Sequence, residues 1–146
     1  FNIAPGKVDI RPNEVLTGIR IERDSYHETY GHYIKYAMRK AMDIATLGSS
    51  VNVRLSDDKR HIERLRMAFG VAAPIPVRAV TVEQAVVGHP LDQDLLRLVA
   101  EGALADVTPR SSWRASKEFR LHLVQELARR AVRASIERAG GVINGN

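Results

Sequence analysis

The sequence predicts an α+β fold in which an antiparallel sheet of three to four strands is covered on one face by about three helices. The N-terminal half alternates apolar and polar residues with the period of two expected for half-buried strands. The C-terminal half instead repeats apolar residues at helical spacing. Segment 72–79 separates the halves, and its two prolines fit neither a sheet ladder nor a helix interior. Strands followed by helices are typical of an α+β sandwich.

Four segments have strand character. The first, 13–22, carries β-branched residues in partial alternation, and a polar turn separates it from the second, 30–38, with which we expect it to pair. Apolar residues alternate with polar ones in a third segment, 51–55, and most strictly in a fourth, 65–71. Because the connections are short, we expect antiparallel pairing with one face covered.

Two shorter helices are predicted after the strands. Thr81, with Gln84 three residues later, indicates a capping box for a helix that ends at Gly88. Segment 91–107 repeats apolar residues at helical spacing, and Pro109 is expected to end this second helix.

The longest predicted element runs from about Ser116 to Ala139. Ser116 is the expected N-cap, and Gly140 with Gly141 supplies a left-handed C-cap. Its apolar residues recur four apart: Phe119, Leu123, Leu127 and Ala131, beside Val124, Ala128, Val132 and Ile136.

Length and composition bound the class of protein. The chain has 146 residues, which fits one domain over 1–146 with a linker-like lead-in over 1–13. It starts at Phe1 without Met, and we interpret it as part of a larger protein. No apolar run is long enough to cross a membrane, and cysteine is absent, so we expect a cytoplasmic protein with no membrane partner.

The motifs of common catalytic sites are absent from the sequence. There is no Walker loop, no Rossmann glycine fingerprint and no HExxH helix, and the five histidines lack ligand spacing. We therefore expect no catalytic residue and no metal ligand in this chain. Lys35 would share a strand face with Tyr33, where the lysine either neutralises an anionic ring or extends along the aromatic into solvent.

Three blocks carry a family resemblance: HYIKYAMRKAMDIATLGSSVNVRL, LRMAFGVAAPIPVRA and DVTPRSSWRASKEFRLHL. Together they resemble the C-terminal domain of the FAD-binding subunit of bacterial xanthine dehydrogenase, a molybdenum hydroxylase, and the similar domain of the CO dehydrogenase flavoprotein. The resemblance implies an oxidoreductase complex of purine metabolism in which a molybdenum-cofactor subunit, iron–sulfur clusters and FAD pass electrons to NAD. This chain would help to enclose the flavin. It is not expected to be active alone, because the family holds FAD mainly through the preceding region of the same subunit.

The resemblance also implies site residues. Lys35 stands where the family places a lysine against the flavin ring, and Leu16, next to Val15, stands where an apolar residue packs beside it. Arg39 matches a basic position in the loop after that lysine. For Trp113, Arg114 and Arg120, in the third block, we expect a role in packing the entry of the last helix rather than in ligand contact.

Two alternatives remain open on the sequence. The formal net charge of +5 and the tyrosines interleaved with Lys35, Arg39 and Lys40 are compatible with a nucleic-acid-binding module. A subunit-docking domain without cofactor contact is the other. Under the flavin interpretation we expect nucleic acid not to be a partner.

Overall fold

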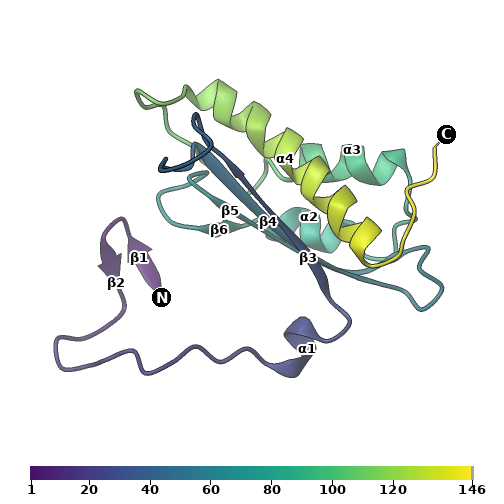
Figure 1. Ribbon diagram of the computed structural model, residues 1–146, viewed down its shortest axis with the longest axis horizontal. Coiled ribbons are helices and arrows are strands. Elements are labelled where there is room, and N and C mark those ends of the chain that lie inside the picture. Colours follow the sequence, from purple (N-terminus) through teal and green to yellow (C-terminus); the bar gives the residue numbers. More distant parts are fainter. Residues whose placement is uncertain (146) are drawn as a thin grey trace.

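The computed structural model describes residues 1–145 and confirms the α+β class. Its main sheet is antiparallel with strand order β3–β4–β5–β6. These strands are Tyr30–Tyr36, Leu47–Leu55, Ile62–Gly70 and Val77–Arg78. Three helices cover one face of this sheet: α2 (Val80–Ala85), α3 (Gln93–Gly102) and α4 (Lys117–Arg138) (Figure 1).

The centre of the sheet is the β4–β5 hairpin, as the strict alternation of its residues predicts. Val51 lies opposite Met67 and Val53 opposite Leu65, so all four side chains point to the same face. Each of them is at most 1% exposed, because the helices cover that face. Fully burying an aliphatic side chain of this size stabilises a fold by about 1.5–3 kcal/mol, so this pairing register is strongly favoured.

Helix α4 begins and ends where the sequence predicts. The Ser116 hydroxyl accepts a hydrogen bond from the backbone N–H of Phe119 at 3.1 Å, which confirms the N-cap. Gly140, with φ +81°, has the left-handed conformation expected after the helix end. Leu123 and Leu127 are buried, whereas Phe119 is 40% exposed and packs edge-on against Tyr36.

Two helix details differ from the predictions. Thr81 does not form the capping box; its backbone N–H and hydroxyl donate to the carboxylate of Asp106, at 2.8 and 3.1 Å. Helix α3 ends at Gly102, well before Pro109, and Asp92 is its N-cap. A side chain at Gly102 would place Cβ 2.9 Å from Val82, so the close packing of α3 on α2 requires glycine at the point where α3 ends.

The predicted strand at 13–22 is wrong. This segment belongs to a stretch, 10–22, that we call the N-terminal arm, and it pairs with no other strand; the strand β3 pairs with β4 instead. The arm follows a small hairpin of β1 (Asn2–Ala4) and β2 (Lys7–Val8) and leads into α1 (Arg23–Tyr26). Its apolar residues do not form a strand because nothing covers them; Val15 and Ile19 are each 84% exposed.

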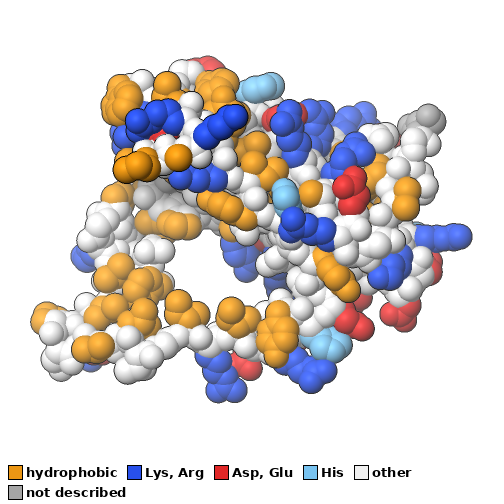
Figure 2. Space-filling model, viewed as in Figure 1, with side chains coloured by type: hydrophobic (Ala, Val, Ile, Leu, Met, Phe, Trp, Pro, Cys, Tyr) orange, Lys and Arg blue, Asp and Glu red, His pale blue; other side chains and the backbone are white. Residues whose placement is uncertain are grey.

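The arm lies on the side of the sheet away from α4 (Figure 1), and a hollow separates it from the body of the molecule (Figure 2). Within residues 1–145, no helix is long and apolar enough to span a membrane.

Candidate functional site

The sheet has one face that no helix covers, which we call the open face. Tyr33 and Lys35 of β3 lie on it, opposite Ser50 and Gly48 of β4. The same rows continue into β5, where Ala68 faces Ser50 and Gly70 faces Gly48. The centre of the open face is therefore a strip of small residues, flat enough for a planar group to approach the backbone closely.

This strip is not among the features predicted from the sequence, although the sequence carries a signal for it. Gly48, Ser50, Ala68 and Gly70 occupy alternate positions at one end of two strands whose other positions are mostly apolar. A solvated sheet face is normally occupied by long polar side chains. Small residues on both central strands indicate instead a surface that another molecule covers.

Lys35 stands at the edge of the strip with its ammonium group fixed. Its Nζ donates a hydrogen bond to the backbone carbonyl of Asp43 at 2.6 Å. The Asp43 carboxylate accepts the backbone N–H of Arg39 at 3.0 Å, and the Arg39 guanidinium donates to the carbonyl of Met42 at 2.9 Å. The hydrogen bond from the Arg39 backbone holds the pKa of Asp43 below its usual value. Arg39 thus shapes the loop that orients Lys35.

Tyr33 lies across the open face beside Lys35. A Cβ added at Gly48 would lie 2.9 Å from the Tyr33 hydroxyl oxygen and 3.5 Å from its ring, so the ring rests directly over the glycine. The tyrosines of β3 divide between the two faces, because Tyr30 and Tyr36 point toward the helix side. They do not form the continuous stacking platform that single-stranded nucleic acid uses.

Arginines surround the other end of the open face. A pocket of about 330 Å³ includes Ser50 and Asn52 in its lining, together with three guanidinium groups, those of Arg64, Arg66 and Arg78. The buried carboxylate of Glu83 accepts hydrogen bonds from Arg78 and from the backbone N–H of Met67 at 2.9 Å. The hydrogen bonds that Arg78 donates to Glu83 raise the pKa of Arg78 above its ordinary value.

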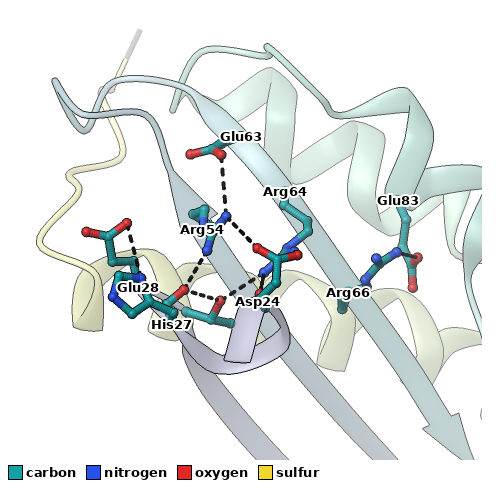
Figure 3. A network of polar contacts seen from close by, with 9 residues as sticks. Asp24, His27, Glu28, Arg54, Glu63, Arg64, Arg66 and Glu83 are labelled. Carbon is teal, nitrogen blue, oxygen red and sulfur yellow. Dashed lines mark hydrogen bonds and ion pairs between the residues drawn. The ribbon is translucent and has the colours of Figure 1, made fainter. Parts of the chain in front are cut away.

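Helix α1 is fastened to this end by two arginines (Figure 3). Arg64 donates to the Asp24 carboxylate at 2.7 Å, and Arg54 donates to the carbonyl of His27 at 2.8 Å. We call this group, Asp24, His27, Arg54 and Arg64, the α1 clamp. Hydrogen bonding and charge from Arg64 lower the pKa of Asp24. The clamp determines where the N-terminal arm leaves the sheet.

The remaining predicted site residues lie on that arm. Val15 is 84% exposed and Leu16 is 54% exposed, and both side chains point into solvent. The arm starts from the β1–β2 hairpin, where Pro5 and the loop after β5 line the same pocket. It ends at the α1 clamp, near the opposite end of the sheet. It therefore spans the open face from end to end, across the hollow visible in Figure 2.

The geometry of the open face suits a planar ring that carries negative charge. Within residues 1–145, no three histidine, aspartate or glutamate side chains gather as a metal site would need. A cationic lysine, a tyrosine ring and a flat backbone surface are suited to an electron-rich ring system.

Comparison with known proteins identifies the class. The family model described as CO dehydrogenase flavoprotein C-terminal domain matches residues 32–135, and the chain belongs to this family. That match includes Lys35 and the four-stranded sheet from His32 of β3 onward, but not the N-terminal arm.

Individual relatives agree with this assignment. The chain is 43% identical, over 97% of its length, to the xanthine dehydrogenase FAD-binding subunit of Escherichia coli, and 29% identical, over 90%, to the glyceraldehyde dehydrogenase medium chain of Sulfolobus acidocaldarius. The match covers 48% of the first relative and 45% of the second, so the chain spans about half their length. Among solved structures, carbon monoxide dehydrogenase from Hydrogenophaga pseudoflava, in a form lacking the Mo-pyranopterin moiety, superimposes with a TM-score of 0.70 at 25% identity, over 77% of this chain and 38% of that one.

Proposed function

We propose that this chain is the C-terminal domain of an FAD-binding subunit in a xanthine-dehydrogenase-like molybdenum hydroxylase, and that its open face covers the flavin. The observation that carries the proposal is the position of Lys35 at the edge of a strip of glycine, serine and alanine on an uncovered sheet face. The 43% identity to a xanthine dehydrogenase FAD-binding subunit supports the same cofactor.

The residues of the open face fit a flavin ring. FAD supplies the transfer of electrons between one-electron and two-electron partners, and reduction adds negative charge to the pyrimidine end of its ring. The ammonium group of Lys35 would stabilise that charge. Gly70 lets a ring approach the backbone closely, and the ring of Tyr33, which lies over Gly48, would pack against it.

The N-terminal arm would close the other side of the site. Val15 and Leu16 are apolar and exposed, so burial against a bound ring gives them the cover that they lack in this chain. Their role would be to exclude water and fix the position of the ring. Arg39 would act indirectly, by holding the loop whose Asp43 carbonyl orients Lys35.

In the complete enzyme, electrons would come from a molybdenum-cofactor subunit that oxidises a purine, pass through iron–sulfur clusters and reach NAD by way of FAD. The region preceding this chain in the same subunit would hold most of the FAD. We place the assembly in the cytoplasm, in keeping with a chain that contains no cysteine.

Obstruction of the open face tests the proposal. Ala68 lies in the centre of the strip, and Ala68→Trp would place an indole where the flavin is proposed to lie. In the full-length subunit, purified without added cofactor, we expect this variant to keep its fold and lose most of its bound flavin, measured by visible absorbance per subunit.

The matched control is Val142→Trp, which adds a tryptophan at a residue that is 71% exposed near the C-terminus. It should retain flavin at the wild-type level. Full flavin content in Ala68→Trp, with a normal circular dichroism spectrum, would contradict the proposal.

A further inference from the structure

Arg120 is a buried cation at the opposite edge of the domain from the α1 clamp. It is 3% exposed, and its guanidinium donates to the carbonyl of Thr46 at 2.6 Å and to the hydroxyl of Ser112 at 2.9 Å. These partners are neutral. They connect the start of β4 to the loop before α4, which accords with the packing role expected for Arg120, but they leave its charge uncompensated.

No carboxylate within residues 1–145 lies within 4.0 Å of the Arg120 guanidinium, and its Nε is buried without a hydrogen-bond partner. Burial, and then the positive charges of Arg110 and Arg114, lower the pKa of Arg120. A buried charge is normally paired, because removing it from water costs free energy that only an opposite charge and hydrogen bonds restore. An arginine placed near two other arginines therefore indicates that an anion belongs there.

A pocket of about 390 Å³ opens beside these cations. Arg110 and Arg120 line it on one side, and the rest of its wall is mostly apolar, including Pro5, Pro74, Ile75 and Pro76. This volume suits a small organic molecule, and few convergent polar groups in an apolar wall are typical of small-molecule sites. Bare phosphate or sulfate would leave the proline wall without a partner.

We propose that this pocket binds a small organic acid, with its carboxylate between Arg110 and Arg120 and its apolar body against the proline loop. Guanidinium groups bind carboxylates through paired charge-assisted hydrogen bonds. Arg120 also holds the carbonyl of Thr46, three residues after Asp43, so a ligand here would be coupled to the loop that orients Lys35.

Benzoate is a suitable probe, because it carries a carboxylate on a flat apolar body, and benzyl alcohol is its neutral counterpart. With the full-length subunit, we expect calorimetric titration to give saturable benzoate binding with a dissociation constant of about 1 mM or lower, and no binding of benzyl alcohol. Bound ligand should also raise the melting temperature with concentration.

Two variants locate the site. Arg110→Gln removes an exposed pocket arginine and should weaken benzoate binding at least about tenfold, which corresponds to about 1.4 kcal/mol. Ile75→Asp supplies a carboxylate within the pocket and should abolish binding. The control, Arg133→Gln, makes the same charge change at an exposed position farther along α4 and should bind benzoate as the wild type does.

Three results would overturn the proposal. One is the absence of benzoate binding to the wild-type subunit. Another is equal binding by Arg110→Gln and Arg133→Gln. The third is a structure of the assembled enzyme in which a protein carboxylate occupies the position between Arg110 and Arg120.

Discussion

Lys35 and Glu83 show how single residues organise the two ends of the open face. Lys35 is held by a backbone carbonyl rather than by a carboxylate, so its positive charge is oriented but not neutralised. Glu83 has the opposite arrangement, because its carboxylate is buried and compensated by Arg78 and Arg66. The cation at one end of the face thus has no carboxylate partner, whereas the arginines at the other end are paired with carboxylates.

Glu83 is the residue whose loss should cost most at this site. Its carboxylate receives the Met67 N–H, which β6 is too short to pair, so Glu83→Ala leaves that donor and two guanidinium groups without their acceptor. We expect the free energy of unfolding to fall by about 2 kcal/mol, measured by urea denaturation.

The matched control for this prediction is Glu63→Ala. Glu63 is half exposed and lies 3.6 Å from Arg54, so its removal should change stability by no more than about 0.5 kcal/mol. Equal effects of the two substitutions would show that burial of Glu83 has no special importance.

At the scale of elements, the sequence predicted β4, β5 and α4 well because their side chains decide their structure locally. Two rows of alternating apolar residues and a serine cap with a terminal glycine are sufficient signals. The segment 13–22 has a similar pattern but forms no strand, because a strand also needs a partner, and none adjoins it. Pairing of this kind depends on the whole chain and cannot be read from a local pattern.

The α1 clamp should respond to acid. Because Arg64 lowers the pKa of Asp24 in the folded protein, the ion pair stabilises the attachment of α1 above the ordinary aspartate pKa of 3.8 and is lost as the pH falls through the lower folded value. We expect the hydrogen-bonded amides of α1, those of Ser25 and His27, to have higher protection factors, that is exchange slowed relative to the intrinsic rate at each pH, at pH 7 than below this range.

Asp24→Ala should lower these protection factors already at pH 7. Asp94→Ala is the control, because it removes an exposed aspartate that pairs with Arg97 within α3. If Ser25 and His27 have equal protection factors in both variants at pH 7, the clamp does not hold α1.

At the scale of the whole molecule, helices cover one face of the sheet and leave the other face open. The N-terminal arm lies on the side of the open face, at a distance from it (Figure 1). The sequence predicted the strands and helices that pack on the covered face, because burial requires apolar residues at regular spacing. The family resemblance also suggested Lys35, Leu16, Val15 and Arg39 as site residues, and their contact with a flavin stays a prediction. The sequence did not reveal the small-residue strip or the placement of the arm, because both depend on which segments become neighbours in space.

The central proposal, which rests on the family assignment and on the open face, is that Lys35 is positioned against a flavin. The most direct test is the reduction potential of the flavin in the full-length subunit carrying Lys35→Met, with Lys40→Met as the control for a nearby exposed lysine. Loss of the cation should lower the potential by about 30 mV, equivalent to about 1.4 kcal/mol for a two-electron couple, while the control stays at the wild-type value. An unchanged potential in Lys35→Met, with flavin still bound, would contradict the claim.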